Sequence, residues 1–190
     1  MQRRAFVKGS MAAAGAWALG SVMAHPAARG TRVQAVIYDE RYADARRFAA
    51  VLGEEGTALL PARGNPVQLW YEASSRMILA SAARIAGLTT QSDAVVARAM
   101  GAARGLKVLY EGMHDGRGVA GLTHRLERTN GPELAMRINT SGAGWARAVA
   151  AEIRSGALAR DGAVLTAFSA GADRSSDFPG TLVSWLLGAA

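Results

Sequence analysis

Short apolar runs alternate with longer amphipathic segments between residues 33 and 110, and this alternation constrains the fold more than any single motif does. Runs that are apolar along nearly their whole length are typical of strands covered on both faces of a sheet. The segments between them are long enough for the crossovers that join parallel strands. The runs predicted to be strands are Val33–Tyr38, Thr57–Leu60, Arg84–Leu88 and Leu106–Tyr110.

The segments between the predicted strands have the spacing of helices. Apolar residues recur at helical intervals within residues 39–56, and Pro66 suits the first turn of a second helix. A third helix begins near Asp93 and ends before Gly105, which tolerates the left-handed conformation of a helix terminus. We therefore expect a three-layer α/β fold with a mostly parallel open sheet, of the Rossmann-like or flavodoxin-like kind.

The second half of the chain predicts an added β-hairpin near residues 123–138. Thr123–Thr129 and Pro132–Ile138 flank Asn130-Gly131, and Asn-Gly is a strong signal for the tip of a hairpin. The other segments are a helix opened by Ser141–Gly144, a strand at Ala163–Phe168 and the apolar tail Thr181–Leu187. This tail is too short to span a bilayer.

Residues 1–24 have the three parts of a signal peptide. Arg3, Arg4 and Lys8 precede an apolar run. The run ends in Val22-Met23-Ala24, where compact side chains at the first and third positions before the cleavage point suit a signal peptidase. We expect cleavage after Ala24 and a single α/β domain in residues 25–190, with no membrane span. The alternative is a retained N-terminal anchor, for which the apolar run is short.

The run Arg3-Arg4-Ala5-Phe6-Val7-Lys8 resembles the signal of the twin-arginine translocation (Tat) pathway. Its paired arginines, Phe, aliphatic residue and Lys follow the pattern of that family, although Gln2 stands where Ser or Thr is usual. The resemblance covers the leader alone. It implies that the Tat export machinery carries the folded protein across a bacterial inner membrane into the periplasm.

Composition narrows the classes of function. The leader holds three of the 22 basic residues and none of the 15 acidic ones, which leaves residues 25–190 with a net charge of +4. Arginines are scattered along the chain rather than interleaved with aromatic residues, so no nucleic-acid partner is predicted. The absence of cysteine excludes disulfides and thiolate-bound metal centres in this chain. No cofactor is indicated.

The loop after the first predicted strand holds Asp39 and Arg41. It contains no glycine, so it is unlike the loops that bring backbone close to phosphate groups. Because ligands of open α/β sheets bind outside the carboxyl ends of the strands, we expect these two residues to contact a ligand. The alternative for Asp39 is a helix cap.

Five consecutive polar residues follow the third predicted strand: Thr89, Thr90, Gln91, Ser92 and Asp93. Hydroxyl and amide groups beside the N-terminus of a helix suit a carboxylate, a phosphate or a sugar oxygen. The alternative is a capping box, in which Thr90 caps the helix and the Asp93 side chain reaches back to the backbone N–H of Thr90.

Glu111, His114 and Asp115 follow the fourth predicted strand, and His124 comes nine residues later. A histidine beside a carboxylate can act as a general base, so His114 and Glu111 are the candidate catalytic residues. His114 and Asp115 are also candidate ligand contacts. The spacing matches no metal signature, and no metal site is predicted.

These observations leave three classes of function open. The first is an exported domain that binds a small polar or anionic ligand, or a partner protein, through the residues above. The second is a small periplasmic hydrolase or isomerase that uses His114. The third is an accessory subunit co-exported with a redox enzyme, which predicts an exposed apolar patch that includes Trp185, Leu186 and Leu187.

Overall fold

The computed structural model of the chain describes residues 32–53, 56–116, 122–127, 132–156, 165–169 and 180–189. The predicted signal peptide and the Asn130-Gly131 turn lie outside these residues. Within the described ranges, none of the helices combines the length and the apolar character that a membrane crossing requires.

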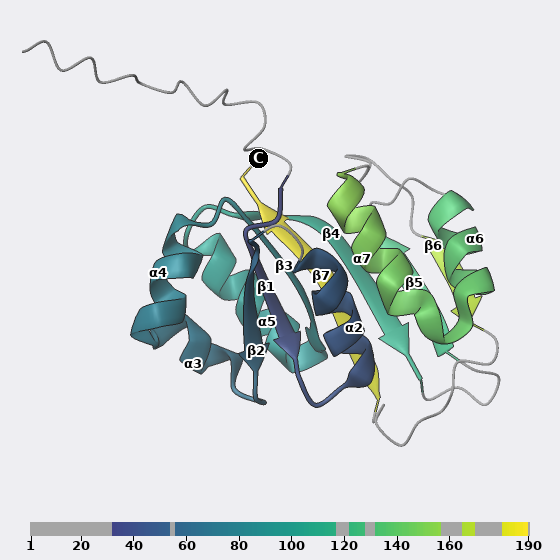
Figure 1. Cartoon of the computed structure of the whole chain (residues 1–190), viewed down its shortest axis with the longest axis horizontal. Coiled ribbons are helices and arrows are strands. Elements are labelled where there is room, and N and C mark those ends of the chain that lie inside the picture. Colours follow the sequence, from purple (N-terminus) through teal and green to yellow (C-terminus); the bar gives the residue numbers. More distant parts are fainter. Residues whose placement is uncertain are drawn as a thin grey trace, which may run out of the picture.

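A mixed, open sheet forms the middle layer of an α/β fold (Figure 1). Its seven strands follow the order β2-β1-β3-β7-β4-β5-β6. The pairs β1–β2 and β1–β3 are parallel, whereas every pair from β3 to β6 is antiparallel. The strands are β1 Ala35–Asp39, β2 Ala58–Ala62, β3 Arg84–Thr90, β4 Lys107–Asp115, β5 Leu122–Glu127, β6 Leu165–Ser169 and β7 Thr181–Gly188.

The prediction of a mostly parallel sheet is wrong because of the last strand. Strand β7 lies between β3 and β4 and is antiparallel to both. β3 and β4 therefore run in the same direction, as predicted, but they are not neighbours. Trp185, Leu186 and Leu187 are at most 1% exposed in this central strand, so they do not form the exposed apolar patch expected of an accessory subunit.

Helices cover both faces of the sheet. One face packs against α2 (Ala43–Leu52), α6 (Pro132–Ser141) and α7 (Trp145–Ser155), whose buried residues share a core with Leu182 and Leu186 of β7. The other face packs against α3 (Pro66–Tyr71), α4 (Ala73–Ser81) and α5 (Gln91–Ala102), which share a second core with Val183 and Trp185. The predicted three layers are therefore present.

The predicted hairpin near residues 123–138 is only half correct. Its first strand is part of β5, but Pro132–Ser141 is helix α6. Leu134 and Ile138 are both fully buried, and their spacing of four residues places them on one side of a helix. The helical period thus prevails over the Asn-Gly signal.

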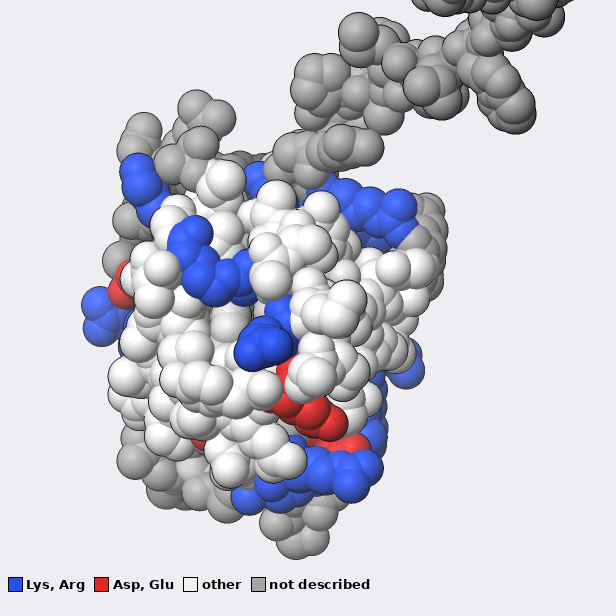
Figure 2. Space-filling view, turned by 90° about the vertical axis from the view of Figure 1, so that its left-hand side faces the viewer, with Lys and Arg blue, Asp and Glu red and all other residues white. Residues whose placement is uncertain are grey.

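The segment that begins at Asn65 forms two short helices rather than one. Asn65 caps α3, with its Oδ1 atom accepting a hydrogen bond from the backbone N–H of Gln68 at 3.4 Å, and Pro66 occupies the first turn as predicted. Glu72 then adopts an extended conformation and separates α3 from α4. Figure 2 shows the side of the molecule that carries these helices: basic side chains lie in separate groups on a largely uncharged surface.

Candidate functional site

The carboxyl ends of β1 and β3 form a topological switch point. From β1 the chain passes through α2 to β2 on one side, whereas β3 pairs with β1 on the other side. Helix α2 covers one face of the sheet, and α3 and α4 cover the opposite face. Crevices at such points are the usual ligand sites of open α/β sheets.

Asp39 and Arg41 lie at this edge, at the end of β1. Asp39 is fully buried and accepts two hydrogen bonds from the Arg41 guanidinium, Nε to Oδ1 at 2.9 Å and Nη2 to Oδ2 at 2.6 Å. The backbone N–H of Arg41 donates a third, to Oδ1 at 3.1 Å. These hydrogen bonds raise the pKa of Arg41 and fix its half-exposed guanidinium at the edge of the sheet.

Gly64, in the loop after β2, leaves room for this guanidinium. Its φ angle is 77°, and a Cβ atom there would lie 3.3 Å from Nη1 of Arg41. The left-handed backbone and the close approach both favour glycine. The loops after β1 and β2 are thus fitted to each other around Arg41.

The polar run Thr89–Asp93 begins within β3 and continues into α5, and its residues are divided between structural and exposed positions. Thr90 is the N-cap of α5, as the capping alternative predicted, and its Oγ1 accepts a hydrogen bond from the backbone N–H of Asp93 at 3.4 Å. Thr89 is fully buried, and its Oγ1 accepts a hydrogen bond from Nε1 of Trp185 at 3.1 Å. Gln91 and Ser92 are exposed, and Ser92 Oγ lies 3.0 Å from Thr90 Oγ1.

Asp93 has an unusual environment for a carboxylate. Asp93 is only 7% exposed, and its Oδ2 atom has no hydrogen-bond partner in the described part of the chain. Burial raises the pKa of Asp93 and the nearby Asp39 raises it further, whereas hydrogen bonds from Thr90 and Ser92 and the charge of Arg41 oppose the shift. A buried carboxylate oxygen without a partner destabilises a fold, and such groups are concentrated at functional sites.

A pocket of about 320 Å³ opens beside these residues. It lies between the start of α2, the junction of β3 with α5, and the start of β7. Its polar groups are hydroxyls and an amide. The lining residues are Tyr42, Thr90, Gln91, Ser92, Gly180, Thr181 and Leu182. The sequence did not indicate the contributions of Tyr42 and Thr181, because the position of β7 could not be predicted.

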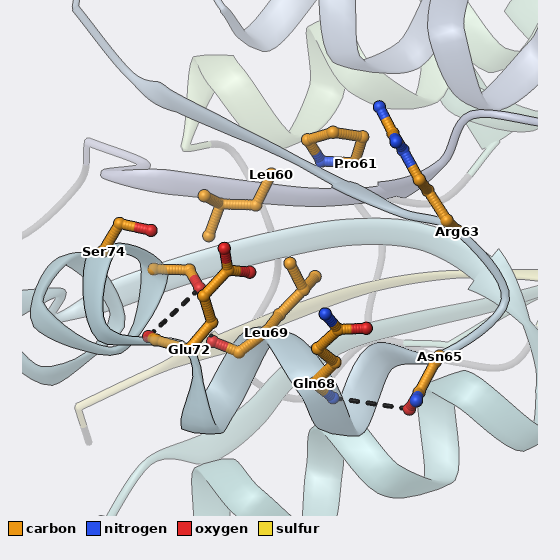
Figure 3. Close-up of a pocket in the computed structure, with 9 residues that line it drawn as sticks. Leu60, Pro61, Arg63, Asn65, Gln68, Leu69, Glu72 and Ser74 are labelled. Atoms are coloured by element: carbon orange, nitrogen blue, oxygen red, sulfur yellow. Dashed lines mark hydrogen bonds between the residues drawn. The ribbon is translucent and has the colours of Figure 1, made fainter.

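A further pocket of about 420 Å³ lies between edge strand β2 and helices α3 and α4 (Figure 3). Three of its six polar side chains already have partners. Asn65 caps α3, Arg63 pairs with Glu40 at 2.8 Å, and the buried Ser75 hydroxyl donates to the Leu69 carbonyl oxygen at 2.7 Å. This pocket is therefore the weaker candidate.

The structure does not bring Glu111 and His114 together. Side chains alternate between the faces of a strand, so these two residues of β4 lie on opposite faces of the sheet. Glu111 pairs with Arg98 of α5. His114 is fully buried against Trp145 of α7, with ring centroids 4.2 Å apart, and it lines neither pocket described above. Asp115 lies opposite Thr181, at the same edge of the sheet as Thr90.

His114 instead belongs to a buried polar chain, which we call the histidine network: Tyr110, His114, His124 and Ser184, each 0% exposed. Nδ1 of His114 lies 2.7 Å from Nδ1 of His124, and its Nε2 lies 2.7 Å from Ser184 Oγ. Ser184 Oγ lies 3.1 Å from the Tyr110 hydroxyl. The fourth strand was predicted to end at Tyr110, but β4 continues to Asp115 and so places Gly112 and His114 within the sheet. Ser184 comes from the unpredicted strand β7.

The histidine network contains two histidines and no carboxylate. In the ranges that the structure covers, histidine and carboxylate side chains do not gather in a group of three or more that could hold a metal ion. Burial lowers the pKa of His124 to about 3. Burial and the neighbouring His124 lower the pKa of His114 well below its usual value.

Comparisons with protein-family models, curated proteins and solved structures found no match to this chain. Function must therefore be inferred from the geometry of the molecule itself. The carboxyl edge of β1 and β3 is the region where a switch point, a polar pocket and an unpartnered buried carboxylate occur together.

Proposed function

We propose that this chain is an exported protein that binds a small polar ligand in the pocket at the carboxyl ends of β1 and β3. The observation that carries the proposal is the coincidence of this pocket with the switch point of the sheet. Polar side chains from segments far apart in the sequence converge there, which is a common property of ligand sites.

The lining supports an uncharged or weakly charged ligand. Hydroxyl groups of Thr90, Ser92 and Thr181 and the amide of Gln91 can each donate and accept hydrogen bonds. Hydroxyl and amide groups of a ligand match this lining. A strongly anionic ligand would meet the nearby carboxyl of Asp93, which opposes the favourable effect of Arg41 and of the α5 N-terminus.

The hydrolase or isomerase alternative lacks such support. Its general base, His114, is fully buried and bonded to His124 and Ser184. A substrate in either described pocket would not contact this side chain. We therefore favour binding without catalysis.

Nuclear magnetic resonance of the 15N-labelled protein tests the binding site. Glucose, glycerol, serine and acetate are suitable first probes, because they differ in charge and in hydroxyl content. We expect a binder to shift the amide signals of Tyr42, Gln91, Ser92 and Thr181. The double variant Gln91→Ala, Ser92→Ala should weaken this binding at least about tenfold, because it removes exposed polar groups from the pocket and leaves the hydrophobic core unchanged.

The matched control is Gln68→Ala, which removes an exposed amide from the further pocket. It should leave binding unchanged. Shifts that cluster around Gln68, or binding that is insensitive to the double variant, would place the ligand elsewhere and contradict the proposal.

The export part of the proposal rests on the leader and has its own test. Replacement of both arginines, Arg3→Lys with Arg4→Lys, should leave the precursor in the cytoplasm of a Tat-competent bacterium. The unaltered chain should reach the periplasm and begin at His25. Export of the double variant at the normal rate would contradict the Tat assignment.

A further inference from the structure

The contact between His114 and His124 limits how many protons the histidine network can hold. The two residues are directly opposite each other in β4 and β5, and their Nδ1 atoms are 2.7 Å apart. Such a contact requires one Nδ1 atom to carry a hydrogen and the other to accept it. The neutral pair satisfies this requirement in either direction.

One added proton can be accommodated. If His114 becomes the imidazolium, its Nδ1–H donates to His124 and its Nε2–H donates to Ser184 Oγ, which lies 2.7 Å away. A second proton must go to the Nδ1 atom that accepts. Two N–H groups would then face each other at hydrogen-bond distance, and the two positive charges would repel inside the core.

Helix α7 covers this pair. The Trp145 ring packs on both imidazoles, with centroid distances of 4.2 Å to His114 and 5.0 Å to His124. The Trp145 indole N–H also donates to Oδ2 of Asp44, in the first turn of α2, at 3.1 Å. Trp145 thus links the histidine pair to α2, whose N-cap residue Tyr42 lines the proposed binding pocket.

Few charged groups face the pair from the surrounding elements. Glu152 of α7 is paired with Arg137 of α6 and lies near the Tyr110 end of the network. From α2, Asp44 is connected to the pair through Trp145, from whose indole N–H it accepts a hydrogen bond. Strand β7 contributes the uncharged Ser184. Beside the pair, the charged residues of β4 and β5 alternate onto the opposite face: Glu111, Asp115, Arg125 and Glu127. Lys107 is exposed at the far end of β4, beyond the bulge between Val108 and Tyr110.

We propose that the His114–His124 pair is an acid-sensitive switch: it keeps α7 on the sheet while it holds at most one added proton, and it releases Trp145 and α7 when both rings are protonated. The low pKa values of the two imidazoles agree with this mechanism. The switch operates without a ligand. Its test is therefore independent of the proposed binding function.

The pH dependence of unfolding counts the protons involved. Both histidines bind protons in the unfolded chain below about pH 6.5, but not in the folded chain until the pH is much lower. Stability is thus present above this pH and is lost as the pH falls. Between about pH 5.5 and about pH 4.5, the two histidines should together raise the unfolding equilibrium constant by up to about 100-fold.

The variant His124→Gln should reduce this histidine contribution to about tenfold, because one buried histidine remains. The control His25→Gln changes the third histidine, which lies outside the described residues, and should behave as the unaltered protein does. Carboxylates that titrate in this range affect all three proteins alike. The difference in the pH dependence of unfolding between His124→Gln and the other two proteins therefore measures the contribution of the histidine pair. Equal pH dependence in His124→Gln and the unaltered protein would overturn the proposal.

Hydrogen exchange of the unaltered protein gives a second test that survives if His124→Gln fails to fold. On acidification we expect amides of α7 to lose protection before those of α5, which packs on the opposite face of the sheet. Trp145 should report the same event by fluorescence. Simultaneous loss of protection in α5 and α7, or loss in α5 first, would show that no separate switch exists.

Discussion

Gly112 shows how a single residue position determines whether the buried histidine network can form. A Cβ atom at this position would lie 2.5 Å from the Tyr110 hydroxyl and 2.8 Å from Ser184 Oγ. Both atoms are fully buried and hydrogen-bonded to each other, so neither can move away without cost. Glycine is therefore needed here for space rather than for backbone conformation.

Gly112→Ala should lower the free energy of unfolding by about 2–3 kcal/mol, because it overpacks a full core and separates a buried hydrogen-bonded pair. Chemical denaturation measures this change. The matched control is Gly144→Ala, where the nearest atom to the added Cβ would be an ordinary 3.4 Å away. Equal effects of the two substitutions would contradict the packing argument.

Asp93 is the residue at which the energetic cost of a buried, unpartnered carboxylate oxygen can be measured. Asp93→Asn removes a charge that burial disfavours, and it should raise the free energy of unfolding at neutral pH by about 1 kcal/mol. Glu133→Gln is the control, since Glu133 also lies in the first turn of a helix but is exposed. It should have no measurable effect. Destabilisation by Asp93→Asn would mean that the carboxylate has a structural role.

At the scale of elements, the sequence predicts those whose signals are local. Strands β1 and β3 and helix α5 were expected near their observed positions, because apolar runs, the Thr90 cap and Gly105 act within a few residues. Strand β7 was not predicted. Its continuous apolar sequence has no strand period, and its place depends on pairing with β3 and β4, which are far away in the chain.

For the candidate site, the location of the residues was predictable from the sequence. Asp39, Arg41 and the run from Thr89 to Asp93 lie at one edge because parallel strands bring their carboxyl ends together. The division of roles within that run was not predictable. Thr89 faces inward to Trp185, a residue of β7 whose position the sequence did not reveal.

The cap of α5 provides a prediction at this scale. Thr90→Ala should lower the free energy of unfolding by about 1 kcal/mol, because Asp93 loses the acceptor of its backbone N–H. Thr140→Ala is the control, since the Thr140 hydroxyl bonds only to carbonyl groups of its own helix among the described contacts. Thermal unfolding compares the two. A smaller loss for Thr90→Ala than for Thr140→Ala would argue against the cap.

At the scale of the whole molecule, β7 joins two parts of the sheet. The parallel strands β2, β1 and β3 lie on one side of it, and the antiparallel strands β4, β5 and β6 lie on the other (Figure 1). It contributes Ser184 to the histidine network and Thr181 to the pocket. The last strand along the chain thus completes both the core and the proposed site.

This topology predicts the order of hydrogen exchange at neutral pH. Amides of β3, β7 and β4 should exchange most slowly, since these central strands open only when the fold opens globally. Edge strand β2 should exchange faster. Faster exchange in β7 than in β2 would contradict the central position of β7 in the folded protein.

The central claim is that a polar ligand binds at the carboxyl edge of β1 and β3. A crystal structure of the protein with the tightest binder from the magnetic resonance screen tests it most directly. We predict electron density for the ligand in contact with Thr90, Gln91, Ser92 and Thr181, close to Asp93. Ligand density in the pocket between β2 and α3, or at any site away from the switch point, would contradict the claim.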